Sequence, residues 1–208
     1  MNTPKVLYGA GCQGRVCMEI AECNGWKFTW VVDDHAKIHQ IYGVPIIQKM
    51  SIPGEISGEF EFVVAAGDNK VREQFAIHLS DFGGKPINLV HPFSQYSQKV
   101  LLGRGVVSMA GVIVNTNVSI GDYCVLNTSS SIDHDCVLGD YVNICPGAHL
   151  AGGVHVGKSS FLGTGCIVNP NVKIGKNCII GSGAVVTTDI PDFSIAYGVP
   201  ARIKRTSA

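Results

Sequence analysis

The stretch NTSSSIDHDCVLGDYVNICPGAHLAGGVHVG, residues 127–157, decides the fold of this chain. An aliphatic residue returns at every sixth position, at Ile132, Leu138, Ile144, Leu150 and Val156. A residue with a small or slim side chain stands four positions after each of these aliphatic residues. A period of six does not match the 3.6-residue period of an α-helical stripe. It predicts a chain that turns a corner every six residues, so that three sides close one coil.

The same period continues outward from this stretch in both directions. Counted from Leu102 to Val186, fourteen of fifteen sixth positions are aliphatic, and Ser108 is the exception. A fixed period sustained over a long stretch is the signature of a repeat architecture. Stacked coils pair like parallel strands, about 4.8 Å apart. We therefore predict a parallel β-helix over residues 102–190, followed by a C-terminal tail over residues 191–208.

Two residue types stand out within these hexads. Four cysteines, Cys124, Cys136, Cys166 and Cys178, occupy slim inward positions, so we expect core packing from them and not ligand or nucleophile chemistry. Glycine often comes directly after the aliphatic residue, where we expect the corner to demand unusual backbone angles. The glycines concerned are Gly121, Gly139, Gly157, Gly163, Gly175 and Gly181.

Residues 1–85 follow a different pattern, in which strand-like and helix-like runs alternate. Strands are expected at 6–9, 28–34, 44–47 and 60–67, with helices at 14–24 and 69–80. Such alternation predicts an α/β domain, with a parallel sheet and helices on its faces. A last strand is expected at 86–92, within a connection that covers residues 86–101.

A glycine-rich turn opens the first of these helices. Gly9, Gly11 and Gly14 form a G-x-G-x-x-G pattern after a strand, and Asp33 ends the next strand about 20 residues later. This pattern is typical of dinucleotide sites, where a helix N-terminus holds phosphates and an acid takes ribose hydroxyls. About 85 residues make only half of a full dinucleotide fold, however, so a packing role for the glycines stays open.

Composition excludes several function classes. Lys+Arg and Asp+Glu both count 16, which argues against nucleic-acid binding, since that requires a basic surplus. The sequence contains no run of 18 apolar residues, so we expect no membrane span. The N-terminus lacks the features of a signal peptide. The eight cysteines form no C-x-x-C pair. We expect a reduced, cytoplasmic protein.

The whole chain resembles the hexapeptide-repeat sugar acetyltransferases of the sialic-acid O-acetyltransferase and bacillosamine-pathway type. The matching segments are VLYGAGCQG, VVDD, NLVHP, residues 127–157 and YGVPAR. The resemblance implies a Rossmann-like domain followed by a left-handed parallel β-helix. It also implies a homotrimer, acetyl-CoA as a co-substrate, no bound cofactor and no metal.

The resemblance places the chemistry at the motif IDHDC. His134 then is the general base, and Asp135 orients or polarises it, although the family more often has Glu at that position. An amino sugar needs such a base, because a proton must leave nitrogen as it adds to a thioester. Neutral histidine suits this task near neutral pH and contributes about 10²–10⁴-fold in rate. An exposed corner histidine without a role is the alternative.

Further site residues follow from the resemblance and the coil period. Gly152 lies 18 residues after His134, and its N–H is an oxyanion-side candidate. Asn143 stands where many relatives have a second histidine, and Asn127 matches an asparagine near the base. Family members lay the pantetheine arm of acetyl-CoA between adjacent β-helices, which implies Gly165, Gly183, Pro200, Ala201 and Arg202. The nucleotide-sugar candidates are Gly11, Gly14, Asp33, Asp34, Asn69 and Arg72.

The function predicted is N-acetylation of the 4-amino group of a nucleotide-linked sugar, with UDP favoured, for bacterial surface glycan and polysaccharide biosynthesis. O-acetylation of a sialic acid or another sugar is the alternative within acyl transfer. A nicotinamide-dependent oxidoreductase follows from the glycine motif alone and leaves the β-helix unexplained. A β-helical zinc hydratase needs three converging histidines, whereas His149 and His155 are expected on different faces. A non-catalytic structural solenoid is a further alternative, for which His134→Ala would leave any function unchanged.

Overall fold

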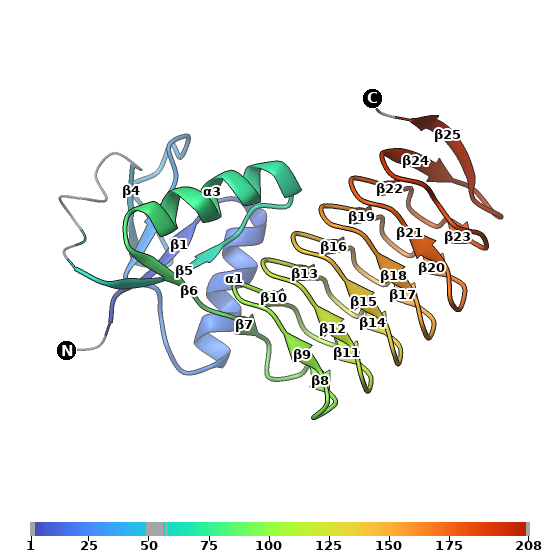
Figure 1. The fold of residues 1–208 in the computed structure, drawn as a ribbon. Coiled ribbons are helices and arrows are strands. Elements are labelled where there is room, and N and C mark those ends of the chain that lie inside the picture. The colour runs from blue at the N-terminus through green and yellow to red at the C-terminus, as the bar shows by residue number, and fades with distance from the viewer. Residues whose placement is uncertain (1–2, 49–55, 57, 207–208) are drawn as a thin grey trace. The chain divides into compact units, whose positions relative to one another are not determined.

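The computed structural model describes residues 3–48, 56 and 58–206, in two compact units that divide between Pro92 and Phe93. The first unit is an α/β domain (Figure 1). Its sheet has the order β3-β4-β2-β1-β5-β6, and all its pairs are parallel except β3 with β4. The elements are β1 (Lys5–Tyr8), α1 (Cys12–Cys23), β2 (Trp30–Val32), β3 (Gln40–Ile41), β4 (Val44–Ile47), β5 (Phe60–Val64), α3 (Asn69–Asp81), β6 (Gly84–Pro86) and β7 (Leu89–Val90).

This unit confirms the predicted alternation and differs in two details. The sequence did not indicate the hairpin β3–β4, whose turn residues Tyr42 and Gly43 both have positive φ, 49° and 79°. Tyrosine is an unusual residue for such a turn, in which Asn or Gly is the expected signal. The single strand expected at 86–92 is two strands, since β6 ends at Pro86, a residue that cannot donate to a ladder.

The second unit is a β-helix built from two-residue strands on three faces (Figure 1). The first face holds β10 (Val107–Ser108), β13 (Val125–Leu126), β16 (Asn143–Ile144), β19 (Phe161–Leu162) and β22 (Ile179–Ile180). The second face holds β8 (Gln95–Tyr96), β11 (Ile113–Val114), β14 (Ser131–Ile132), β17 (His149–Leu150), β20 (Ile167–Val168) and β23 (Val185–Val186). The third face holds β9 (Leu101–Leu102), β12 (Ser119–Ile120), β15 (Val137–Leu138), β18 (His155–Val156) and β21 (Lys173–Ile174).

The register of these strands confirms the period read from the sequence. Ser131 pairs with His149 and Ile132 with Leu150, so each coil has 18 residues, and the pairing is parallel. Inward aliphatic and slim residues form one continuous core. The four inward cysteines are fully buried there, and burial raises the pKa of the Cys166 thiol to about 12. A thiol in that state is unsuited to nucleophilic chemistry at neutral pH, which fits its packing role.

The β-helix begins earlier than the sequence indicated. Strand β8 pairs with β11 at Gln95 and Ile113, so residues 95–101 belong to the coil, whereas the sequence placed them in a connection. The repeat was hidden because the inward position of this coil is taken by Tyr96, a partly buried aromatic residue packed against the core. Ser108, the one non-aliphatic position of the series, is fully buried.

The C-terminal tail closes the first face. Strand β24 (Ser194–Tyr197) pairs in parallel with β22, and β25 (Arg202–Thr206) folds back on it antiparallel. The inward Ala196 is fully buried and extends the core to this end. The tail is therefore a hairpin that continues the β-helix.

The glycine prediction for the corners was wrong in its reason. Positive φ falls three residues after the aliphatic residue, for example 59° at Asp135, 67° at Gly165 and 67° at Gly183. Gly121, which directly follows an aliphatic residue, does not have this conformation. A Cβ there would lie 2.6 Å from the Asp140 nitrogen of the next coil, so the stacking distance excludes a side chain. The same holds for Gly139, Gly157, Gly163, Gly175 and Gly181.

Candidate active site

His134 lies at the corner between the second and third faces, just after β14. Its side chain is 57% exposed, and its Nδ1 lies 2.8 Å from Oδ2 of Asp135, which has the same exposure. Asp135 adopts the left-handed conformation that Asn117, Gly153 and Asn171 also have at this position of other coils, so the fold itself places an acid beside the imidazole. The hydrogen bond with Asp135 raises the pKa of His134 and lowers that of Asp135.

Both carboxylates beside His134 are held by the preceding coil. Asp133 Oδ1 accepts hydrogen bonds from the His134 backbone N–H at 2.8 Å and from Asn115 Nδ2 at 2.7 Å. Asp135 Oδ1 accepts from Asn117 Nδ2 at 3.2 Å. These two asparagines were not predicted from the sequence. Their signal was the motif NTN placed 18 residues before DHD.

Gly152, on the following coil, lies directly against the imidazole. A Cβ at Gly152 would be 2.5 Å from His134 Nε2, nearer than side chains come, so the ring needs a glycine there. The Gly152 N–H has no hydrogen-bond partner among the described residues, while its carbonyl accepts from Asn171 N at 3.0 Å. With Nδ1 donating to Asp135, Nε2 keeps the lone pair that accepts a proton, next to a free backbone donor.

The other β-helix candidates do not gather around His134 within one chain. Asn127, Gly165 and Gly183 follow strands of the first face, so they lie at the corner between the first and second faces. Asn143 belongs to the first face and is only 4% exposed. One side of the prism therefore separates these residues from the imidazole.

The tail candidates lie between β24 and β25. Ala201 is buried, and its N–H donates to Val185 O at 2.8 Å on the second face. The peptide bond between Val199 and Pro200 is cis. Arg202 is exposed, and its guanidinium donates to the Ala201 carbonyl at 2.9 Å. The hairpin thus presents an exposed cation close to the second face of the β-helix.

In the first unit, the glycine-rich turn is tightly packed around Gly9 and Gly14. Gly9 has φ 109°, and a Cβ on Gly14 would collide with the Gly9 carbonyl. Gly11 has open space around it and precedes α1. The Asp33 carboxylate accepts from the Ala10 and His35 N–H groups, each at 2.8 Å. Close packing explains two of the glycines, and Asp33 fixes the turn itself.

The remaining nucleotide-sugar candidates have unequal surroundings. The exposed Asp34 accepts from the Tyr8 hydroxyl at 3.3 Å, and burial together with this acid raises the pKa of Tyr8. Arg72 is only 1% exposed, and its guanidinium donates to the Ala66 carbonyl and to Asn69 Oδ1, each at 2.8 Å. Arg72 and Asn69 therefore support the turn between β5 and α3.

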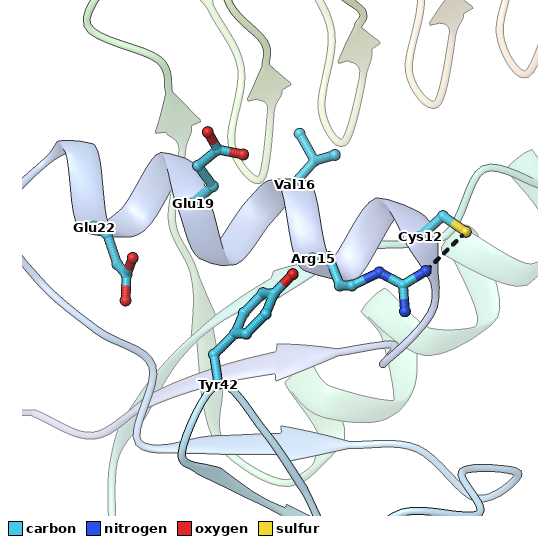
Figure 2. Close-up of a pocket in the computed structure, with 6 residues that line it drawn as sticks. All are labelled: Cys12, Arg15, Val16, Glu19, Glu22 and Tyr42. Carbon is cyan, nitrogen blue, oxygen red and sulfur yellow. Dashed lines mark hydrogen bonds between the residues drawn. The ribbon is translucent and has the colours of Figure 1, made fainter.

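A hollow of about 470 Å³ lies beside α1. Figure 2 shows its lining, in which Tyr42 from the β3–β4 turn faces one side of the helix. The other lining residues, Cys12, Arg15, Val16, Glu19 and Glu22, all belong to α1. Arg15 lies in the first turn of α1, and its Nη2 donates to Cys12 Sγ at 3.2 Å. This cation was not predicted from the sequence, although its position directly after Gly14 of the glycine motif was an available signal.

Comparison with known proteins matches both units. Residues 6–79 match the PglD N-terminal domain, and residues 153–188 match the bacterial transferase hexapeptide family of six repeats. GDP-perosamine N-acetyltransferase of Escherichia coli O157:H7 is 30% identical over 168 residues, which cover 78% of this chain and 76% of that relative.

Two solved structures match nearly the whole chain. PerB from Caulobacter crescentus, in complex with CoA and GDP-perosamine, has a TM-score of 0.91 and 37% identity, covering 99% of both chains. The acetyltransferase domain of PglB from Neisseria gonorrhoeae FA1090, in complex with acetyl coenzyme A, has a TM-score of 0.90 and 32% identity, covering 98% of this chain and 100% of that one.

This chain belongs to the left-handed β-helix sugar acetyltransferases.

Family membership sets aside three of the alternatives. An acetyltransferase is neither a nicotinamide-dependent oxidoreductase nor a non-catalytic solenoid. For the hydratase, the structure places His149 on the second face and His155 on the third, as expected. Within the described ranges, no three His, Cys, Asp or Glu side chains form a group able to hold a metal, and no helix is long and apolar enough to span a membrane.

Proposed function

We propose that this acetyltransferase moves the acetyl group of acetyl-CoA to the 4-amino group of a nucleotide-linked amino-deoxy sugar, for bacterial surface glycan synthesis. The observation that carries the proposal is the His134 imidazole, paired through Nδ1 with Asp135 and lying with Nε2 against Gly152. The sugar nitrogen attacks the thioester carbonyl and gives its proton to Nε2. The carbon–sulfur bond then breaks, and CoA leaves as the thiolate, which takes the proton.

Gly152 is the proposed oxyanion partner. As nitrogen adds, negative charge develops on the thioester oxygen, and a preorganised backbone donor stabilises that charge. The Gly152 N–H is the donor beside the base that has no hydrogen-bond partner in the described part of the chain. Base and donor lie on successive coils, so both charges of the transition state are met within one small area.

The proposed enzyme is a cytoplasmic homotrimer, and its acetyl-CoA groove lies between adjacent β-helices. The division of the candidate residues supports this arrangement. His134 and Gly152 lie at one corner, whereas Gly165 and Gly183 lie at another, with open space where a Cβ would be. A second copy that brings the corner with Gly165 and Gly183 against the corner with His134 lines one groove with both sets. Asn127 and Asn143, with Pro200, Ala201 and Arg202, are proposed to belong to the same groove.

The nucleotide of the acceptor is proposed to bind at the glycine-rich turn of the first unit. Gly11 leaves the start of α1 open, and a helix N-terminus favours phosphate. Arg15 adds a cation in the first helical turn, and the exposed Asp34 offers an acceptor for sugar hydroxyls. Asp33, Asn69 and Arg72 act by holding the turns around this site. Because two relatives of high coverage are GDP-perosamine enzymes, we place GDP before the UDP that the sequence favoured.

A thiol-release assay tests the proposal. Acetyl-CoA is offered with GDP-, UDP- and dTDP-linked 4-amino sugars, and with a sialic acid as the hydroxyl acceptor. The expected result is CoA release with one nucleotide amino sugar, GDP-linked first, and product acetylated on nitrogen by mass spectrometry. Release with the sialic acid alone would establish the O-acetyltransferase instead. If no acceptor of either class gives CoA release, the proposed function is contradicted.

A further inference from the structure

The coil before His134 has two asparagines, one at each position that corresponds to an acid beside the base. Residues 115–117 read NTN, and residues 133–135, one 18-residue coil later, read DHD. Parallel pairing of β11 with β14 brings the two corners into register. Each asparagine therefore lies beneath one of the acids that flank the imidazole, and Thr116 lies beneath the imidazole itself.

The contacts at this corner follow that register. Asn115 Nδ2 donates to Asp133 Oδ1 at 2.7 Å, and Asn117 Nδ2 donates to Asp135 Oδ1 at 3.2 Å. Asp135 uses its other oxygen, Oδ2, for His134 Nδ1 at 2.8 Å. The amide of Asn117 thus holds the carboxylate from one side while the imidazole bonds to it from the other.

We propose that Asn117 and Asn115 are positioning residues for acetyl transfer, which hold the two flanking carboxylates so that the His134 ring stays against Gly152. This inference rests on the proposed function. Asp135 is exposed, and without the Asn117 amide its side chain can rotate away from Nδ1 and leave the ring free to turn. Asn115 acts through Asp133, which also accepts from the His134 backbone N–H and so fixes the backbone where the ring begins.

The electrostatic surroundings of His134 are simple enough for this proposal to be read from a pH profile. Asp133 and Asp135 flank the ring and favour its protonated form. The coil before supplies Asn115, Thr116 and Asn117, and the coil after supplies Ala151, Gly152 and Gly153, none of which titrates. Among the residues of these three coil corners, a change in the placement of one carboxylate is therefore the change that acts on the pKa of the imidazole.

Asn117→Gly is the first test variant. Asn117 has φ 58°, a conformation that glycine adopts without strain, so the substitution removes the amide donor and leaves the turn possible. Asn177→Gly is the matched control, because Asn177 has φ 54° at a different corner. Asn115→Ala is the second test variant, at a residue without positive φ, and keeps the test open if the first variant unfolds.

The measurement is kcat/KM as a function of pH, with KM for acetyl-CoA and thermal unfolding measured alongside. Asn117→Gly is expected to lower kcat/KM about tenfold and to move its acidic limb to lower pH, because the imidazole loses a steady carboxylate. Asn115→Ala is expected to lower kcat and to move the acidic limb in the same direction by a smaller amount, because the hydrogen bond to Asp135 is the larger cause of the raised pKa of His134. Asn177→Gly is expected to leave both unchanged. Unchanged kcat and pH limb in both test variants, with His134→Asn strongly impaired, would overturn this inference alone. An unimpaired His134→Asn would overturn the proposed function as well.

Discussion

Replacing Gly152 by alanine is expected to displace the His134 imidazole while the backbone stays as it is. Gly152 does not have a positive φ, and Ala110 occupies the same hexad position, so alanine is tolerated there by the backbone. The new Cβ, however, would lie 2.5 Å from Nε2, whereas ordinary contacts begin at 3.4 Å. The nearest ring atom, Cε1, would lie 2.4 Å from the new Cβ, so the ring must move by about 1.0 Å to reach an ordinary contact.

A displacement of this size is large for catalysis. Misplacement of a reacting group by about 1 Å costs on the order of 10²-fold in rate. The Gly152 N–H is retained in alanine, so the change isolates the position of the base from the oxyanion donor. We expect kcat/KM for the nucleotide amino sugar to fall at least about 10²-fold. Thermal unfolding should change little, because the exposed ring can rotate into solvent.

A double-mutant cycle decides whether the loss acts through the histidine. If Gly152→Ala impairs the enzyme by moving the base, it should cause no further loss in the His134→Asn background, since coupled residues are not additive. The thiol-release assay on the two single variants and the double variant measures this coupling. Wild-type activity in Gly152→Ala, or fully additive losses in the double variant, would refute the reasoning.

Three further predictions follow from the same geometry. Asp135→Asn should lower the maximal rate and move the acidic limb of the kcat/KM profile, where activity falls as His134 becomes protonated, to lower pH. The reason is that the base acts when neutral and the Asp135 carboxylate raises the pKa of His134. A limb that stays in place would contradict this pairing. Gly14→Ala should lower the free energy of unfolding of the first unit by about 2–3 kcal/mol in denaturant, since its Cβ meets the Gly9 carbonyl. Gly11→Ala places its Cβ in open space and should leave the free energy of unfolding unchanged. Equal effects of the two substitutions would remove the packing argument. Arg72→Met should cost about 2 kcal/mol of stability by leaving buried carbonyls unpaired. Arg15→Met should keep stability and raise KM for the nucleotide sugar. A raised KM without loss of stability in Arg72→Met would instead make Arg72 a direct ligand.

The β-helix could be predicted from the sequence because its period is physical. One inward aliphatic residue per side is needed to fill a narrow prism, so every coil repeats the requirement at Ile132, Leu138 and Ile144 and onward. The start of the helix could not be read, because Tyr96 fills the inward position by a different residue type. Ser108 interrupts the aliphatic series soon afterwards, so the period is weakest near the start of the β-helix.

The site could be predicted where the coil length alone sets a contact. The coil length placed Gly152 over His134 by simple counting, and the structure shows the two in contact. Counting could equally have paired Asn115 with Asp133 and Asn117 with Asp135, but asparagine at a β-helix corner also serves for its left-handed conformation, as at Asn177. The burial of Arg72 could not be predicted from the sequence, since a cation near the start of a helix is ordinarily exposed, whereas tertiary packing leaves Arg72 only 1% exposed.

The central claim is that His134 removes the proton from the attacking amine, and one measurement tests it most directly. The pH dependence of kcat/KM is compared between the wild type and His134→Asn, with the nucleotide amino sugar that the acceptor panel identifies. The account predicts a loss of about 10²–10⁴-fold and the disappearance of the acidic limb that reports the imidazole. A variant that keeps the wild-type rate and the same limb would contradict it.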